Sequence, residues 1–211
     1  LEFFKNSENG FICQLNNYVF ELPLVGEFNL SNALAAYHSV KYLGYSDDQV
    51  IPFLAKLSPP PGRMQQLENS HIWIDYAHTP DALDNALSTL KTHYPEFKIR
   101  VLFGCGGDRD KGKRQIMGKI ASETADSIIL TNDNPRSEDP QSIVDDILAG
   151  TKVENDVQVI LDRGDAIKSA VQTLGEEEAL LIAGKGHETT QVIGSKTLQF
   201  SDIEVALNAL N

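Results

Sequence analysis

The stretch IRVLFGCGGDRDKGKR, residues 99–114, decides the fold prediction, because a strand, a glycine-rich turn and the start of a helix follow one another in it. Residues 99–103 form a largely apolar run without strict alternation, which is typical of a strand covered on both faces. Glycines at 104, 106 and 107 then interrupt regular structure, and a helical pattern begins near Lys113. The stretch therefore predicts one strand-loop-helix unit of a parallel sheet.

The same unit recurs along the chain. The predicted strands are 72–75, 99–103, 127–131, 157–161 and 179–183. The predicted helices are 80–93, 113–123, 140–148, 162–174 and 201–210. This alternation predicts an α/β fold, a mostly parallel sheet with helices on both faces. Ligands bind beyond the carboxyl ends of such strands, so the loops that follow the strands are the candidate site.

The beginning of the chain follows another pattern. Two apolar-rich runs, 11–15 and 18–22, are joined by Asn16-Asn17 and predict a β-hairpin. Helices are expected over 29–43 and 47–56. Three consecutive prolines, residues 59–61, then remove three backbone donors and stiffen the chain. We therefore predict two domains, residues 1–61 and 62–211.

The composition excludes several classes of protein. Of the 211 residues, 41% are hydrophobic and 23% are charged, as in globular proteins. A net charge of −12 disfavours binding to nucleic acid. No apolar run reaches the roughly 18 residues of a membrane helix, and two cysteines are too few for a disulfide scaffold. We expect an intracellular chain without nucleic-acid or membrane partners.

The loop after the first predicted sheet strand contains Asp75 and His78. Asp75 closes the strand, and His78 projects from the turn before Thr79 and Pro80, which are well suited to begin a helix. Both polar residues are candidates for a binding site. An Asp that caps a turn and a solvated His are the alternative interpretation.

The glycine-rich loop nearly matches two phosphate-binding motifs and fails both. The dinucleotide fingerprint needs glycine where Arg109 stands, and the P-loop needs Ser or Thr where Arg114 stands. Four cations remain beside a helix N-terminus, namely Arg109, Lys111, Lys113 and Arg114. They favour a site for an anion or carboxylate, and a solvated basic turn is the alternative.

Two further loops supply mixed charges. In the third loop, Arg136 could pair with a carboxylate while Asp133 receives an ammonium, a combination that suits an amino acid. Polar residues are also common in ordinary turns. In the last loop, Glu188 is a second acceptor for a cation. The sequence HETTQ, residues 187–191, lacks the second His of a zinc motif, so we reject zinc there.

The order of six motifs is more specific than any one loop. They are GEFNLSN (26–32), GRM (62–64), DYAHTP (75–80), FGCGGDRDKGKR (103–114), DNPR (133–136) and GKGHE (184–188). From about Val25 onward the chain resembles the Mur ligases, and most closely the members that add meso-diaminopimelate. The resemblance implies that residues 62–211 form the Rossmann-like C-terminal domain, which binds the amino acid. Residues 1–61 would be the tail of the central ATPase domain, a second α/β domain.

The resemblance also implies a reaction. Family members use ATP and Mg²⁺ to convert a carboxylate into an acyl phosphate, which the amine of the amino acid attacks to form an amide. Here the acceptor would be UDP-N-acetylmuramoyl-L-alanyl-D-glutamate (the UDP-MurNAc-dipeptide), in peptidoglycan synthesis. No Gly-Lys pair of this chain is followed by Ser or Thr, and the family's UDP-sugar domain and carbamylated lysine are missing. We therefore expect a fragment that is inactive alone, with no catalytic or metal-binding residue and no bound cofactor.

Site residues follow from the matched motifs. Those implied for meso-diaminopimelate are Arg109, Asp133, Asn134, Pro135, Arg136, Gly184 and Glu188. Those implied for ATP are Asn32, Arg63, Asp75 and His78, although Asn29 and Asn32 could instead cap a helix. A cytoplasmic monomer is expected. The alternatives are a lysine-adding Mur ligase, a folylpolyglutamate synthetase-like ligase, and a non-catalytic amino-acid-binding module.

Overall fold

A computed structural model describes residues 3–7, 10–67, 70–152 and 156–210. The chain divides into two compact units, Leu1–Pro60 and Pro61–Asn211, and each is described by itself. In the described part of the chain, no helix has the length and apolar character needed to cross a bilayer.

The first unit contains a three-stranded antiparallel sheet in the order β1-β2-β3. The strands are β1 (Phe3–Ser7), β2 (Gly10–Leu15) and β3 (Tyr18–Leu22). The predicted hairpin is confirmed as β2 and β3, and Asn16 takes a φ of 53° in the turn between them. β1 was not predicted, because its alternation is weak and its residues are mostly exposed.

Two helices pack on this sheet to form the first unit's core. They are α1 (Glu27–Tyr42) and α2 (Asp47–Leu54). Phe11, Leu22, Leu30 and Ile51 belong to one buried apolar cluster that joins sheet and helices. Burial of such side chains stabilises each by about 1.5–3 kcal/mol, so this unit has a core of its own.

The start of α1 corrects one alternative from the sequence. The helix begins at Glu27 with Gly26 as its N-cap residue. Asn29 and Asn32 therefore lie inside the helix and do not cap it. The buried amide of Asn29 instead donates to the carbonyl of Val25 at 2.9 Å.

The second unit is built on a six-stranded sheet in the order β4-β5-β9-β6-β7-β8. The strands are β4 (Gln65–Gln66), β5 (Ile72–Asp75), β6 (Lys98–Phe103), β7 (Ser127–Leu130), β8 (Asp156–Val159) and β9 (Glu178–Ala183). All neighbours are parallel except β4, an antiparallel edge strand. The predicted mostly parallel sheet is confirmed. A two-stranded hairpin, β10 (Thr190–Ile193) and β11 (Lys196–Gln199), was not predicted.

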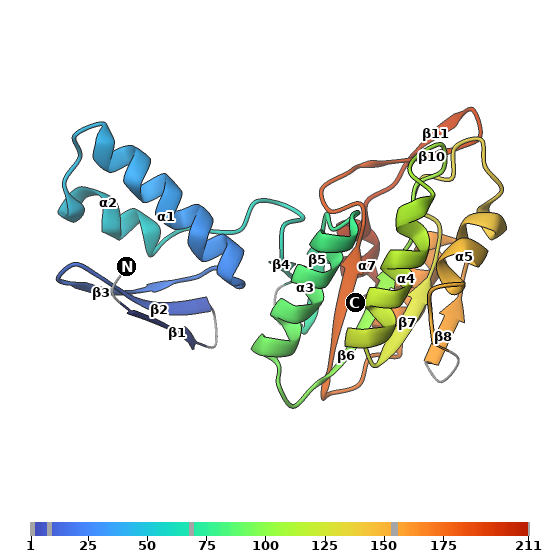
Figure 1. The fold of residues 1–211 in the computed structure, drawn as a ribbon, viewed down its shortest axis with the longest axis horizontal. Helices are drawn as coiled ribbons and strands as arrows, with labels where there is room; N and C mark the ends of the chain where they lie inside the picture. Colours follow the sequence, from blue (N-terminus) through green and yellow to red (C-terminus); the bar gives the residue numbers. More distant parts are fainter. Residues whose placement is uncertain (1–2, 8–9, 68–69, 153–155, 211) are drawn as a thin grey trace. The chain divides into compact units, whose positions relative to one another are not determined.

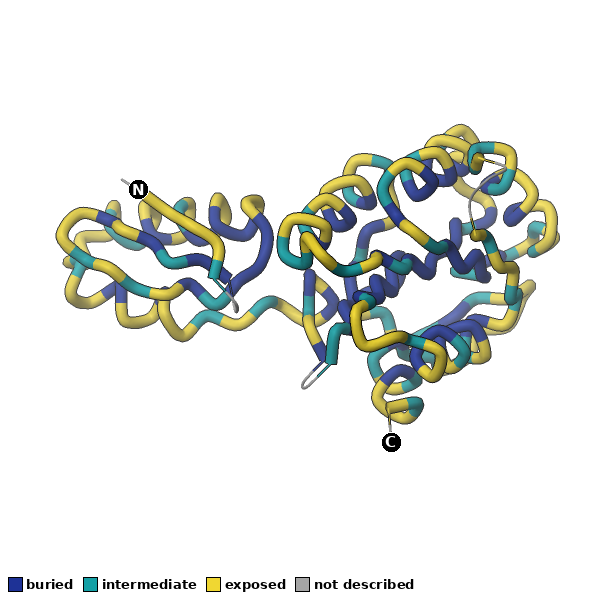
Figure 2. The backbone as a smooth tube through the Cα atoms, turned by 90° about the horizontal axis from the view of Figure 1, so that it is seen from below, coloured by how far each residue is buried: buried dark blue, intermediate teal, exposed yellow. Residues whose placement is uncertain are grey.

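Helices cover both faces of this sheet (Figure 1). They are α3 (Pro80–His93), α4 (Gly112–Thr124), α5 (Pro140–Leu148), α6 (Arg163–Gln172) and α7 (Asp202–Leu210). The first three form one layer, and α6 and α7 pack together on the opposite face. In Figure 2 the strands are a dark, buried band between two layers of helices whose outer sides are exposed.

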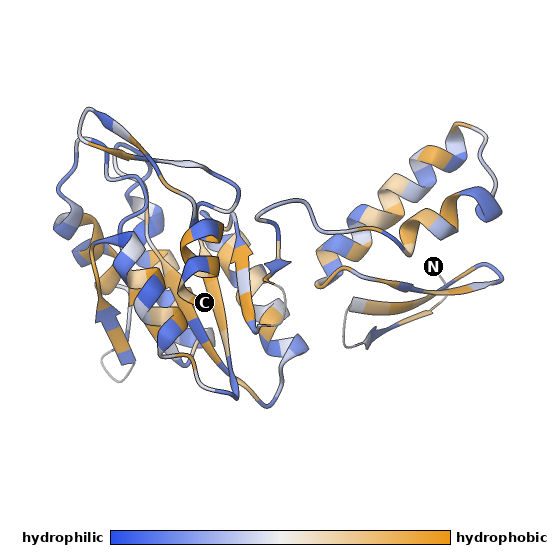
Figure 3. Cartoon of the chain, turned by 180° about the vertical axis from the view of Figure 1, so that it is seen from behind, coloured by the Kyte–Doolittle hydropathy of each residue, from blue (hydrophilic) through white to orange (hydrophobic). Residues whose placement is uncertain are grey.

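The strand sequences explain this three-layer arrangement. Ile74, Val101 and Leu180 in the central strands are completely buried, and Figure 3 shows that hydrophobic residues predominate along the strands of this sheet. A strand that faces water on neither side needs no alternation of polar and apolar residues. Because β5, β6, β7 and β9 are parallel, the loops after them meet at one edge of the sheet.

Candidate functional site

A cavity of about 540 Å³ lies at the edge of the sheet where these four loops meet. Its lining residues come from the ends of β5, β6, β7 and β9, far apart in the sequence. They are Tyr76, His78, Thr79, Gly104, Gly106, Arg109, Asp110, Lys113, Asp133, Arg136, Gly184 and Glu188. The cavity thus brings together Arg109, Asp133, Arg136, Gly184, Glu188 and His78 from the residues that the sequence singled out.

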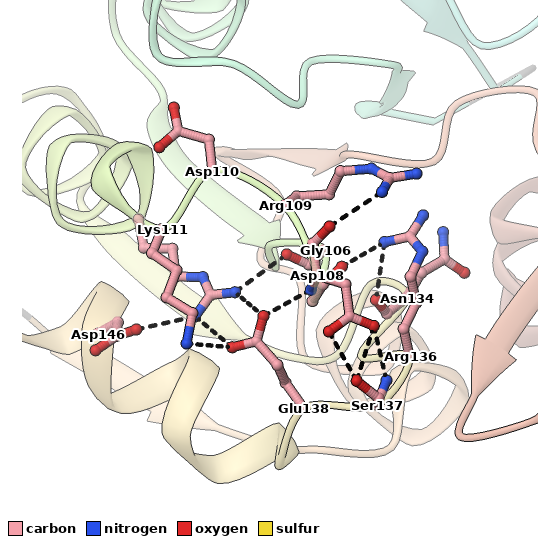
Figure 4. Close-up of polar contacts among 12 residues, drawn as sticks. Gly106, Asp108, Arg109, Asp110, Lys111, Asn134, Arg136, Ser137, Glu138 and Asp146 are labelled. Carbon is pink, nitrogen blue, oxygen red and sulfur yellow. Dashed lines mark hydrogen bonds and ion pairs between the residues drawn. The ribbon is translucent and has the colours of Figure 1, made fainter.

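Arg136 presents a fixed guanidinium to this cavity. Its Nη1 donates to the carbonyl of Gly107 at 2.8 Å and to that of Asn134 at 3.3 Å (Figure 4). Within the described residues, its Nη2 has no hydrogen-bond partner. A Cβ at Gly106 would lie 2.8 Å from Nη1, so glycine leaves the room that this guanidinium occupies. Two fixed bonds orient the rest of the group towards a ligand.

The backbone at Arg136 has a feature that the sequence did not indicate. Its φ of 52° lies in the left-handed region, which non-glycine residues seldom adopt. Two hydrogen bonds to the β10–β11 hairpin hold this conformation, from the N–H of Arg136 to the carbonyl of Val192 in β10 and from the N–H of Gly194 in the turn to the carbonyl of Arg136. The unpredicted hairpin therefore sets the direction of a candidate binding side chain.

Three carboxylates, Asp110, Asp133 and Glu188, supply the negative charge of the cavity. Gly184 has a φ of 115°, and a Cβ there would lie 2.8 Å from Oδ2 of Asp133. Burial raises the pKa of Glu188, but the hydrogen bond and charge of Lys185, with help from Asn134 and Arg136, lower this pKa overall. Glu188 is therefore ionised at neutral pH.

Asn134 and Pro135 are not among the cavity-lining residues. The Asn134 amide is buried and already engaged, since Oδ1 accepts from the N–H of Val192 at 2.8 Å and Nδ2 donates to Glu188 at 3.2 Å. The carbonyl of Pro135 lies 1.9 Å from where a Cβ at Gly107 would stand. Both residues contact the loops that shape the site, and their expected contact with a ligand stays a prediction.

The expected cluster of four cations separates into two pairs. Arg109 and Lys113 line the cavity. Arg114 is completely buried and donates to both oxygens of Glu138 at 2.9 and 3.0 Å, and Lys111 lies 3.1 Å from the same carboxylate (Figure 4). Half of the expected anion-binding charge is therefore neutralised within the protein. The cations are visible in the sequence, but their pairing with Glu138, 24 positions after Arg114, is not.

The residues implied for ATP have different relations to this cavity. His78 lines it, and the guanidinium of Arg63 lies 4.6 Å from the ring centre of Tyr76, another lining residue. The Asp75 carboxylate accepts the N–H of Met64 at 2.7 Å, and burial raises its pKa despite the backbone N–H groups of Met64 and Ala77. Asn32 belongs to the first unit, so its relation to the others is undefined.

Two contacts near the cavity were not predicted from the sequence. Lys113, one of the four expected cations, donates to the carbonyl of His78 at 2.6 Å. Arg163 is completely buried and binds both oxygens of Asp202 at 2.7 Å. It also donates to the carbonyls of Asn132 and Ala183, just before two cavity loops. Among the described residues, no group of three or more His, Cys, Asp and Glu side chains is arranged to hold a metal ion.

Known proteins match this chain over most of its length. A family profile described as "Mur ligase, glutamate ligase domain" matches residues 62–186. A protein of Rickettsia conorii named UDP-N-acetylmuramoyl-L-alanyl-D-glutamate--2,6-diaminopimelate ligase is 45% identical over 202 residues, which are 95% of this chain and 42% of that protein. A protein of the same name from Coxiella burnetii is 48% identical over 194 residues, 90% of this chain and 40% of that protein.

Solved structures agree in fold. The structure of a ligase with the same printed name superposes with a TM-score of 0.73 at 37% identity, covering 98% of this chain and 44% of that chain. A Mycobacterium tuberculosis folylpolyglutamate synthase, with a TM-score of 0.69 and 23% identity, shares the fold. The chain spans less than half the length of the relatives that it matches.

Proposed function

Because this chain belongs to the Mur ligase family, we propose that it is the amino-acid-binding part of a longer ligase that adds meso-diaminopimelate to UDP-N-acetylmuramoyl-L-alanyl-D-glutamate. The curated relatives named for this reaction support the proposal. The whole enzyme would act in peptidoglycan synthesis in the cytoplasm, as a monomer. ATP and Mg²⁺ would belong to that whole enzyme.

One observation carries the proposal: cations and carboxylates line a single cavity in equal numbers. Its charged lining residues are the cations Arg109, Lys113 and Arg136 and the anions Asp110, Asp133 and Glu188. meso-Diaminopimelate has an ammonium and a carboxylate at each end, so a cavity of mixed charge matches one end of it. A planar guanidinium binds a carboxylate through two parallel hydrogen bonds.

In this proposal, the loops hold the distal end of the amino acid. Arg136, with the help of Arg109, pairs with the distal carboxylate, while Glu188 and Asp133 receive the distal ammonium beside Gly184. The other end is left for the reaction, in which the amine attacks an acyl phosphate and phosphate leaves. Catalysis by positioning needs such a fixed grip on the substrate.

The same arrangement explains how lysine would be rejected. Lysine lacks the distal carboxylate, so it would leave Arg136 without a partner inside the cavity. A site built around a polar partner can reject an analogue that lacks it by about 10⁴ or more. The mixed cavity thus favours the diaminopimelate-adding function over a lysine-adding one.

The test is steady-state kinetics of the full-length ligase with Arg136→Ala. We expect KM for meso-diaminopimelate to rise by about 10- to 100-fold, the usual cost of losing a hydrogen bond to a charged group. KM for ATP should stay within about threefold, since the proposal assigns Arg136 to the amino acid and not to the nucleotide. Lys119→Ala, which removes an exposed cation on α4, is the control.

Three outcomes would contradict the proposal. Equal loss for both substrates would mean that Arg136 supports the fold and not the amino-acid site. Comparable use of lysine by the wild type would favour the lysine-adding alternative. Binding of meso-diaminopimelate without any ligase activity of the full-length protein would favour a non-catalytic binding module.

A further inference from the structure

Lys185 has a completely buried side chain next to the cavity but does not line it. A buried ammonium is costly unless it is paired with an acceptor. Its Nζ lies 2.8 Å from Oε2 of Glu188 and donates to Oδ1 of Asn134 at 3.3 Å. Of its two side-chain partners, Glu188 is the one that lines the cavity.

The contacts of Glu188 fall on one of its two oxygens. Oε2 accepts from Lys185 and from Nδ2 of Asn134 at 3.2 Å. In the part of the chain that the structure describes, Oε1 has no hydrogen-bond partner. A carboxylate offers about four lone-pair sites over two oxygens, so one oxygen is anchored while the other is free to bind a ligand in the cavity.

The Asn134 amide fixes the orientation of this group. Its Oδ1 accepts from the N–H of Val192 in β10 as well as from Lys185. The oxygen side of the amide is therefore committed to two donors, and the Nδ2 side must face Glu188. A hydrogen-bond network that is satisfied in this way holds its members rigidly.

Other charged groups also face Glu188. Arg136 and Arg163 attract it, and Asp133 lies in the same cavity. Arg163 is bound to Asp202 through both oxygens, and Nη1 of Arg136 is bound to carbonyls. Among the described residues, Lys185 is the cation in direct contact with Glu188.

We propose that Lys185 is a positioning residue, the buried counter-charge that anchors one oxygen of Glu188 so that the other receives the ammonium group of an incoming amino acid. The identity of the ligand rests on the proposed function. The pairing itself does not depend on it, so the two claims can be tested separately.

The first experiment needs no ligand. The carboxyl carbon of Glu188 is titrated by ¹³C NMR in the 211-residue chain, in the wild type, Lys185→Gln and Lys185→Met. Lys185→Gln keeps a hydrogen-bond donor without the charge. We expect the pKa of Glu188 to rise by about one unit or more in both variants, because an adjacent opposite charge shifts a carboxyl pKa by about 1–3 units.

The control is Lys168→Gln, which removes an exposed lysine from the surface of α6. It should leave the titration of Glu188 unchanged. Circular dichroism shows which variants are folded. If Lys185→Met is unfolded, the titration of Lys185→Gln decides whether the proposal holds. An unchanged titration in folded Lys185→Gln would overturn the proposal.

The second experiment measures ligand preference by calorimetry. meso-Diaminopimelate is compared with 2-aminopimelate, which keeps both carboxylates and lacks the distal amino group. The wild type should prefer meso-diaminopimelate by about tenfold or more, the value of one charged hydrogen bond. Lys185→Gln should lose this preference, and so should Glu188→Gln.

A preference that is retained in Lys185→Gln would overturn the role of Lys185. If the wild type binds neither compound, the proposed function loses support, and the NMR titration still decides the pairing.

Discussion

Glu138 is a residue that organises the glycine-rich loop without lining the cavity. Its carboxylate accepts from the N–H of Asp108 at 2.6 Å and from both terminal nitrogens of Arg114. Lys111 lies 3.1 Å away. The hydrogen bonds from Arg114, the N–H of Asp108 and Lys111 lower the pKa of Glu138 from 4.5 to about 2. The ionised form of this carboxylate thus holds the loop after β6 against the start of α5.

The free energy of unfolding should therefore depend on pH through the protonation of Glu138. A carboxyl whose folded pKa is depressed stabilises the fold above its unfolded pKa. The contribution of Glu138 is complete above pH 4.5 and is lost as the pH falls towards about 2. In urea unfolding followed by the fluorescence of Trp73, the free energy of unfolding should fall more steeply across this range in the wild type than in Glu138→Gln.

The control for this prediction is Glu123→Gln. Glu123 pairs with Lys119 on the exposed surface of α4 at 3.9 Å, and exposed pairs contribute little. Its pH dependence should follow that of the wild type. Parallel curves for the wild type and Glu138→Gln would show that Glu138 does not carry this acid sensitivity.

At the scale of elements, Arg163 and Asp202 join the start of α6 to the start of α7. Both side chains are completely buried, and the two contacts at 2.7 Å form a bidentate pair. The remaining donors of Arg163 bind the carbonyls that end β9 and follow β7. This pair thus connects two helices with two of the strands whose loops form the cavity.

Removing one partner of this pair should be costly. Asp202→Ala leaves a buried guanidinium uncompensated, and we expect a loss of about 3–5 kcal/mol in the free energy of unfolding. Asp165→Ala removes the exposed partner of Lys168 on α6 and should cost no more than about 1 kcal/mol. Urea unfolding measures both. Equal effects would mean that Arg163 finds other acceptors or that water reaches it.

Elements with local signals were predicted well from the sequence. β5, α3 and α5 have the predicted bounds, because their apolar runs and their Pro residues at the helix starts are short-range features. The N-cap role of Thr79 is likewise confirmed by its bond from the N–H of Ala82. The candidate cavity loops were found because topology alone brings strand ends together.

Features that depend on distant partners were missed. The bond between Asn134 and Val192 spans 58 positions, and no local pattern in the β10–β11 hairpin indicates it. The sequence also shows four cations in one loop, but it does not show that Arg114 forms ion pairs with Glu138 and Asp146. Residue types indicate which charges are present, but only the fold decides which remain available to a ligand.

At the scale of the whole chain, the two units have separate cores. Phe11, Leu22 and Leu30 belong to the cluster of the first unit, and Ile74 and Leu180 belong to one of the second. The first unit comprises only residues 1–60. A domain of that size buries only about 60% of the surface of its unfolded chain, and it is correspondingly marginal. The three prolines at residues 59–61 lie where the units meet.

We therefore expect the units to unfold separately, the first one at lower urea. Trp73 is the single tryptophan of the chain and is buried in β5 of the second unit. Its fluorescence reports on that unit alone, whereas far-ultraviolet circular dichroism reports on the helices of both. The circular dichroism transition should begin at lower urea than the fluorescence transition.

The control is the second unit alone, residues 61–211. It should show one transition by both probes, because one core then remains. Coincident transitions in the whole chain would mean that the two cores are energetically coupled.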